Sequence, residues 1–286
     1  MRKVGIVTDS TACIPDELVA KYNICIVPLM IIFEGKSYRD GIDISPGEVY
    51  RIMRRRENLP TTSTTSAGDF LDAYRRLSDE VESVLCITVT SQQSKTYDTA
   101  LVAKEMAKET LTHTAIDVLD SRSVGGALGL IVLEAARAAS EGANMARVTE
   151  VARGMMPRVH FIAMLDTLFY LARTGRTGRA AAWAGSLLKI KPILEHATST
   201  GVTMPVARPR TKTKAVKQLM EIMGERVGDS PVHVIAHHAD EQEDGEKLKA
   251  DIASQFNCVE LYLTEFTPVM GVHCGPGVLA VTFYTE

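Results

Sequence analysis

A histidine and a cysteine stand side by side near the end of the chain, in the stretch VMGVHCGPGVLAVTFY (269–284). His273 and Cys274 precede Gly275, and the apolar residues around them indicate a strand. The pair is compatible with a Cys–His nucleophile, a metal ligand or the polar end of an apolar ligand site. Because neighbouring side chains of a strand point to opposite faces, we expect the two residues not to act on each other. Cys274 is then expected to pack inward.

Hydroxyl groups gather in three other stretches of the sequence. TDST (8–11) follows an apolar strand pattern, PTTSTTSAGDF (60–70) precedes a helical pattern, and TSQQSKTY (90–97) follows the strand pattern VLCITV. Ser, Thr and Asp cap helices, which explains one residue in each loop but not the clustering. Ligands of parallel sheets bind at the carboxyl ends of the strands, so these loops are candidate binding loops.

Several familiar motifs are missing or incomplete. Asp9 lacks the second aspartate of a phosphotransfer DxD motif, since the sequence continues Ser10-Thr11, and no GxxxxGK[ST] phosphate loop occurs. The glycines of GGALG (125–129) lack the GxGxxG spacing and indicate close helix packing instead. HHAD (237–240) resembles a metal cluster, but it lies between a strand and an acidic helix start. We therefore expect it to form a solvated loop and predict no metal site.

The composition is that of an ordinary globular protein. The 286 residues are 45% apolar and 23% charged, with a formal net charge of −3. This charge disfavours nucleic acid as a partner, because phosphate binding needs a basic surface. The basic run RIMRRRE (51–57) is expected to be the solvated face of a helix. No segment is long and apolar enough to be an integral membrane span or a signal peptide, and five cysteines occur singly, so we expect a cytoplasmic protein with reduced thiols.

Strand and helix patterns alternate along the first half of the chain. An apolar run at 24–33, VLCITVT (84–90) and AIDVLD (115–120) are predicted strands, and helical patterns separate them. Such a succession predicts a parallel, Rossmann-like sheet covered by helices.

In the second half strands lie closer together. HFIAML, LLKIKPIL (187–194), VTMPVA, PVHVIAH, CVELYL and VLAVTFY are predicted strands, with two helical patterns between them. The sequence therefore predicts an α/β protein of two domains, residues 1–158 with a parallel sheet and residues 159–286 with a mixed sheet.

The opening VTDST and seven further stretches, in order, resemble motifs of the DegV family, which includes the fatty-acid-binding subunits of bacterial fatty acid kinase. After the opening VTDST, the matching stretches are YRDGIDIS (38–45), the Thr62-Ser63 pair, SQQSKTY (91–97), LARTGR (171–176), LLKIKPIL (187–194), RTKTKA (210–215) and VHCGPG (272–277). The resemblance covers the whole chain, and the order of the motifs makes it specific.

This resemblance implies that one long-chain fatty acid, such as palmitate, stearate or oleate, lies between the two domains. Its carboxyl group would be held by Thr62, Ser94 and His273. Further neighbours of this group would be Ser63, Ser91 and Gly275. The family arginines correspond to Arg176 and Arg210, which would serve transfer by a partner fatty acid kinase. The resemblance thus implies a substrate-presenting subunit with no catalytic residues and no cofactor of its own.

The sequence departs from the family pattern at a few positions. Lys95 replaces a glycine beside the expected head group, Thr64 and Thr65 replace Gln-Pro, and Thr174 replaces a glycine. Two orientations of Lys95 are open. The side chain either points to solvent or adds a cation near the carboxylate, and the second orientation would change which ligand is bound. Two other functions stay open: a hydrolase that uses Ser94 or Cys274, and a small-ligand sensor without a kinase partner.

Overall fold

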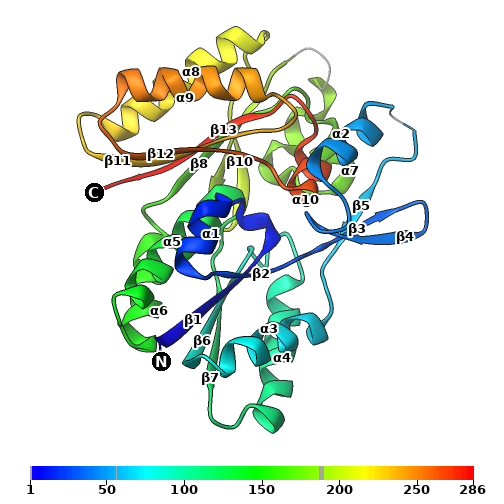
Figure 1. Ribbon diagram of the computed structural model, residues 1–286. Coiled ribbons are helices and arrows are strands. Elements are labelled where there is room, and N and C mark those ends of the chain that lie inside the picture. Colours follow the sequence, from blue (N-terminus) through cyan, green and yellow to red (C-terminus); the bar gives the residue numbers. More distant parts are fainter. Residues whose placement is uncertain (1, 56, 187–189) are drawn as a thin grey trace.

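The chain forms an α/β structure with three sheets (Figure 1). The computed structural model describes residues 2–55, 57–186 and 190–286. Within these residues, no helix has the length and apolar character needed to cross a membrane. The two-part α/β architecture predicted from the sequence, with a parallel and a mixed sheet, is confirmed.

The first sheet consists of four parallel strands. Their order across the sheet is β2 (Cys25–Val27), β1 (Arg2–Asp9), β6 (Val81–Thr88) and β7 (Ala115–Asp120). Helices α3 (Ala67–Ser78) and α4 (Thr96–Thr110) pack on one face, and α1 (Asp16–Tyr22), α5 (Gly125–Ser140) and α6 (Met145–Met155) on the other. The apolar runs of β1 and β6 are buried on both faces for this reason.

The second sheet has six strands and is mixed. Its order is β10 (Val202–Ala207), β9 (Ile193–Ala197), β8 (His160–Met164), β13 (Leu279–Thr285), β11 (Val232–His238) and β12 (Cys258–Glu265). Only β11 and β12 pair in parallel. Helices α8 (Lys212–Val227) and α9 (Gln242–Gln255) cover its outer face. We propose a domain boundary at residues 158/159, between α6 and β8, and refer to the parts on either side as the N-terminal and C-terminal lobes.

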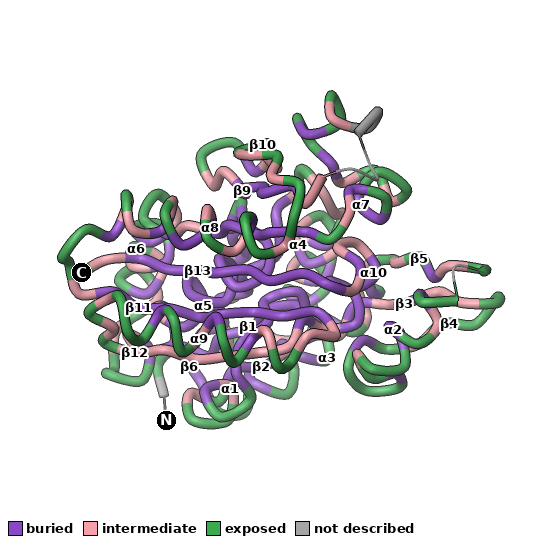
Figure 2. Tube along the Cα trace, turned by 90° about the horizontal axis from the view of Figure 1, so that it is seen from above, coloured by how far each residue is buried: buried purple, intermediate pink, exposed green. Residues whose placement is uncertain are grey.

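Helix α5 lies between the two large sheets and belongs to the core of both lobes. Most of its sixteen residues are buried, since it is apolar around its whole circumference. Figure 2 shows the buried strands β11 and β13 running across α5. Its glycines permit close approach on both sides, because a Cβ on Gly126 would lie 2.2 Å from His237 Nε2 of β11, and one on Gly129 would lie 2.4 Å from the carbonyl oxygen of Ala12. The close packing expected for these glycines is confirmed.

A smaller unit lies at one side of both lobes. Strands β4 (Lys36–Arg39), β3 (Met30–Phe33) and β5 (Thr61–Ser63) form an antiparallel sheet. Near it lie the helices α2 (Pro46–Arg54), α7 (Phe169–Thr174) and α10 (Pro268–Cys274). Two 3-10 segments, Ser10–Ala12 and Gly178–Ser186, occur in other parts of the chain. Exposed Arg51 and Arg54 lie on α2, as predicted for the basic run, of which residue 56 is outside the described residues.

Three expectations about local structure differ from the structure in whole or in part. The run 24–33 forms two strands in different sheets, because Pro28 interrupts the pairing between them. The predicted strand 187–194 falls partly on residues outside the described part, and β9 begins only at Ile193. His237 and His238 of HHAD do not lie in a solvated loop: both are buried on β11.

Candidate functional site

A cavity of about 300 Å³ lies between the two lobes. Its apolar wall comes from both lobes and from the small sheet, and it includes Leu29, Val89, Val124, Phe161, Leu165 and Met270. This volume lies at the lower end of the range for ligand pockets. The loops after β1 and β6 reach the cavity from the carboxyl ends of their strands, as the sequence predicts.

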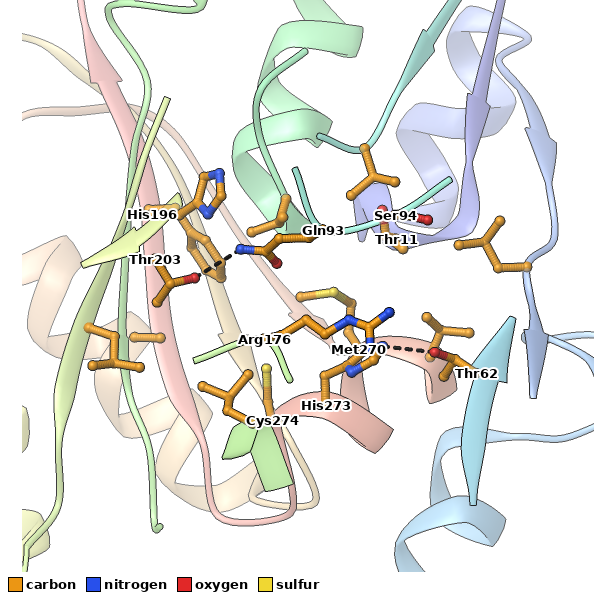
Figure 3. Close-up of a pocket in the computed structure, with 18 of the residues that line it drawn as sticks. Thr11, Thr62, Gln93, Ser94, Arg176, His196, Thr203, Met270, His273 and Cys274 are labelled. Atoms are coloured by element: carbon orange, nitrogen blue, oxygen red, sulfur yellow. Dashed lines mark hydrogen bonds between the residues drawn. The ribbon is translucent and has the colours of Figure 1, made fainter. Parts of the chain in front are cut away.

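One end of the cavity is marked by a hydrogen bond between Thr62 and His273. Thr62 Oγ1 lies 2.9 Å from His273 Nε2, although the residues are 211 positions apart in the chain. Thr62 is on β5, which pairs with β3, and His273 is in the last turn of α10. Figure 3 shows both side chains at the same end of the cavity, close to Arg176. The structure therefore brings together two of the three predicted head-group residues.

Ser94 lines the same cavity and belongs to a chain of hydrogen-bonded hydroxyl groups. Its Oγ lies 2.7 Å from Thr96 Oγ1, and Thr96 in turn donates to Thr64 Oγ1 at 3.2 Å. Ser94, Thr64 and Ser63 all line the cavity. Two of the hydroxyl-rich stretches of the sequence thus meet at the cavity, where Thr96 links Ser94 to Thr64.

Burial determines the protonation states of His273 and Cys274 at this end of the cavity. Burial, together with the charges of Arg176 and Arg173, lowers the pKa of His273 to about 3. The imidazole is therefore neutral at neutral pH. Burial likewise raises the pKa of the Cys274 thiol to about 12, so the thiol is protonated.

Lys95 lies at the rim of the cavity, and its side chain is exposed to solvent. Its Nζ forms an ion pair with Asp98 Oδ2 at 3.0 Å, and the side chain is 81% exposed. Of the two orientations expected from the sequence, the structure shows the one toward solvent. Such an exposed pair contributes little to stability.

The strand expected around His273 and Cys274 is a helix, which corrects the sequence analysis. Pro268 occupies the first turn of α10 and Gly275 follows its last residue with a φ of 80°. This arrangement of Pro at the start and Gly at the end is a helix signal that the apolar pattern hid. Both side chains line the cavity instead of pointing to opposite faces, and Cys274 is only partly buried.

Three other predicted residues lie outside the described cavity wall. Ser91 donates to Asp120 Oδ2 at 2.6 Å at the end of β7. Gly275 faces Tyr170, since a Cβ there would lie 2.1 Å from the ring atom Cδ2. Arg210 is exposed in the loop before α8. Of the two predicted arginines, only Arg176 lines the cavity.

The opposite end of the cavity was missed by the sequence analysis. Gln93 Nε2 donates to Thr203 Oγ1 at 3.1 Å across the two lobes, and His196 lies beside them (Figure 3). These residues meet only through the packing of β9 and β10 against the loop after β6, and no sequence motif connects them. Within the described residues, no group of three or more His, Cys, Asp or Glu side chains is arranged to hold a metal ion.

Fold and site together define a two-lobed α/β protein with an apolar cavity between the lobes, one end of which has hydroxyl groups, a neutral imidazole and the guanidinium of Arg176. Residues 3–286 match the family described as "Uncharacterised protein, DegV family". The chain is 33% identical over 286 residues to a DegV domain-containing protein of Caldanaerobacter subterraneus subsp. tengcongensis, covering 99% of both chains. The chain therefore belongs to the DegV family.

Solved structures of similar proteins have the same fold. A DegV family protein from Thermus thermophilus, described for its fatty acid binding, superposes with a TM-score of 0.91 at 26% identity, covering 99% of this chain and 100% of that one. A stearic acid-binding protein from Eubacterium ventriosum superposes with a TM-score of 0.89 at 25% identity, covering 99% and 98%.

Proposed function

We propose that this protein binds one long-chain fatty acid, such as palmitate, stearate or oleate, between its two lobes. The observation that carries the proposal is the interlobe cavity, whose apolar wall ends at the Thr62–His273 hydrogen bond. The fatty acid binding of the Thermus thermophilus protein and the stearic acid binding of the Eubacterium ventriosum protein support it. A palmitate tail gains about 0.8 kcal/mol per buried methylene, from which the costs of association are subtracted.

We assign the carboxyl group of the ligand to the end formed by Thr62, Ser94 and His273. A buried carboxylate needs hydrogen-bond donors, and a neutral imidazole, the Arg176 guanidinium and hydroxyl groups that turn from their present partners are such donors. If Thr62 donates to Nε2 of His273, the remaining hydrogen of the neutral ring is on Nδ1. This Nδ1 is buried and has no partner among the described residues, so it is available to a ligand oxygen. Ser63 is a further hydroxyl at this end.

We further propose that the protein presents its ligand to the catalytic subunit of a fatty acid kinase. The kinase would transfer the terminal phosphoryl group of ATP to a carboxylate oxygen of the bound acid, giving an acyl phosphate and ADP. Arg176 lines the cavity at this end and Arg210 is exposed, so the first would contact the head group and the second the kinase. Five free cysteines fit the reducing cytoplasm, where we place the protein.

The hydrolase alternative has less support from the geometry. The pKa of Cys274 is raised to about 12, whereas a nucleophilic thiol needs a lowered pKa. Ser94 Oγ is engaged with Thr96, at 2.7 Å from Oγ1 and as acceptor from the backbone NH at 3.2 Å, rather than with a base. The apolar wall between the two polar ends likewise gives less support to a sensor of a small ligand that is polar throughout.

Native mass spectrometry of the purified protein, followed by solvent extraction, tests the proposed binding. We expect one co-purifying fatty acid per chain, or stoichiometric uptake of added palmitate or oleate after extraction. Absence of both would refute the binding proposal. The carrier role is tested separately with a fatty acid kinase catalytic subunit and ATP, where acyl phosphate should form only when this protein is present.

A further inference from the structure

The end of the cavity opposite Thr62 and His273 is polar, which an unsubstituted alkyl tail does not require. Leu194 and His196 lie on the same face of β9, and Thr203 of β10 is paired with His196. Leu194, His196 and Thr203 all line the cavity, as does Phe161 of β8. The apolar part of the cavity wall that the C-terminal lobe contributes is therefore followed by the imidazole of His196 and the hydroxyl group of Thr203.

The hydrogen bonds of His196 fix what its ring offers to a ligand. Nε2 lies 3.0 Å from the carbonyl oxygen of Arg122, which only accepts, so Nε2 carries the hydrogen. Burial lowers the pKa of His196 to about 4, and the ring is neutral at neutral pH. Nδ1 is then an acceptor without a hydrogen. It is buried and lacks a hydrogen-bond partner among the described residues, and the whole side chain is 3% exposed.

Neighbouring side chains do not satisfy this nitrogen. Glu195 also lines the cavity, but its carboxylate is held by Arg226, at 2.8 Å from Nη2, and lies 3.8 Å from His160 Nδ1. The amide of Gln93 is directed to Thr203. His196 also borders a second hollow outside the cavity, lined by polar residues such as Asp120 and Arg153. The surroundings of this end are thus polar on both sides of the ring.

The two polar ends lie on opposite sides of the N-terminal sheet. Thr62 belongs to the small sheet, which follows β2 at one edge, whereas Arg122 follows β7 at the other edge. A ligand that reaches from Thr62 to His196 therefore crosses the carboxyl ends of β1 and β6. Figure 3 shows the Thr62–His273 pair and the Gln93–Thr203 pair on different sides of the cavity.

We propose that the His196 end is a subsite for a hydroxyl group, and that the ligand is a long-chain fatty acid with a hydroxyl in the distal half of its tail. This deepens the function proposed above and rests on it. The ligand hydroxyl donates its hydrogen to Nδ1 of His196, and its oxygen is free to accept from Gln93 or Thr203. The two ends of the cavity then have complementary roles: the head end donates to a carboxylate, and the far end accepts from an alcohol.

Binding of matched acids to the delipidated protein tests this subsite. The ligands are hexadecanoic acid and its 2-hydroxy, 12-hydroxy and 16-hydroxy derivatives, measured by displacement of a fluorescent fatty acid. We expect the 12- or 16-hydroxy acid to bind about fivefold more tightly than hexadecanoic acid, the gain of one additional hydrogen bond. The 2-hydroxy acid, whose hydroxyl lies near the carboxyl group, should show no such gain.

A variant locates the effect at His196. In His196→Phe the ring shape is kept and Nδ1 is lost, so the distal hydroxy acid should bind no better than hexadecanoic acid, whose affinity should stay or rise. His113→Phe changes an exposed histidine and should behave as wild type. If the variant does not fold, the 15N chemical shift of Nδ1 in the wild-type protein should still move on addition of the 16-hydroxy acid and not of hexadecanoic acid.

The outcomes separate the two proposals. A protein that binds none of these acids refutes the fatty acid function itself. A protein that binds hexadecanoic acid at least as tightly as every distal hydroxy acid, with an unmoved Nδ1 shift, keeps that function and overturns the hydroxyl subsite. An equal preference for the distal hydroxyl in wild type and His196→Phe would also overturn it.

Discussion

Thr62 Oγ1 and His273 Nε2 lie 2.9 Å apart and connect a strand of the small sheet to the helix α10 near the end of the chain. Because His273 is neutral, this contact places a hydroxyl and an imidazole at the cavity end without a fixed positive charge on the ring. With Thr62 donating to Nε2, the hydrogen bond to a carboxylate bound there would come from Nδ1 of His273, whose ring Thr62 orients. This dependence is the basis of the first prediction.

His273→Ala should weaken fatty acid binding about tenfold to a hundredfold. The substitution removes a hydrogen bond to a charged group, and it leaves the Thr62 hydroxyl without its imidazole partner. Equilibrium dialysis with radiolabelled oleate measures the change. His113→Ala, which alters an exposed histidine, serves as control and should retain wild-type affinity. Unchanged oleate affinity in a folded His273→Ala protein would contradict the head-group assignment.

Arg176→Ala and Arg210→Ala should reduce phosphorylation of the bound acid more than its binding. Arg210 is exposed, so its loss should lower the rate of productive encounter with the kinase and the salt dependence of that rate. Arg176 lies at the cavity end and should affect the transfer step itself, with a fall in kcat/KM of about tenfold or more. Steady-state kinetics at varied carrier concentration separate the two effects.

Arg147→Ala provides the control for these charge deletions. Arg147 is 61% exposed on α6 and pairs with Glu150, outside the cavity wall. Its kinetics should match the wild type at every salt concentration. Equal losses in lipid binding and in transfer for Arg176→Ala and Arg210→Ala would argue against their proposed roles.

The parts of the site that depend on local sequence were predicted, and those that depend on the packing of the lobes were not. The hydroxyl loops at strand ends follow from strand periodicity, whereas Thr62, Ser94 and His273 were named as head-group residues from the family resemblance alone. The Gln93–Thr203 and His196–Arg122 contacts join residues 110 and 74 positions apart, and neither pair has a distinctive neighbouring motif.

The helical conformation around His273 was also not predicted. The alternation of apolar residues favoured a strand, whereas in the structure the N-terminus of α10 is held from outside by another element. Asp40 Oδ1, in the loop after β4, accepts a hydrogen bond from the backbone NH of Val269 at 3.0 Å. An apolar pattern alone carries no information about such a distant acceptor.

Asp40→Asn should become more stable relative to wild type as the pH rises. Burial raises the pKa of Asp40 from 3.8 to about 6, with a smaller contribution from the charge of Asp9. The folded protein therefore binds more protons than the unfolded chain between these values, and its stability falls as the pH rises through them. The difference between the variant and wild type should change by about 3 kcal/mol from pH 3.5 to pH 7.

The comparison of variant with wild type is needed because buried histidines act in the opposite direction. Burial lowers the pKa of His237 to about 3, so its contribution to stability is present above 6.5 and is lost as the pH falls. Urea unfolding at several pH values measures the difference. Asp229→Asn, at an exposed aspartate before β11, should show no pH-dependent difference from wild type. A pH-independent difference for Asp40→Asn would contradict the raised pKa.

Gly126→Ala should destabilise the protein by about 3 kcal/mol or more, because α5 lies too close to the C-terminal sheet for a Cβ. That atom would lie 2.2 Å from His237 Nε2 and 2.4 Å from Thr282 Oγ1. Both groups are buried and hydrogen-bonded to each other at 3.0 Å, so neither can move without breaking that contact. Gly154→Ala is the matched control, since nothing lies within 4 Å of a Cβ there.

Urea unfolding of the two glycine variants separates crowding from helix propensity. Gly154→Ala on α6 should gain up to about 1 kcal/mol from the better helix propensity of alanine. The same gain applies to Gly126→Ala and is outweighed by the clash. Val124 lines the cavity two residues before Gly126, so a displaced α5 should also weaken oleate binding in Gly126→Ala but not in Gly154→Ala. Equal stability of the two variants would show that α5 and the C-terminal sheet separate easily, which would contradict the close packing of α5 between the two large sheets.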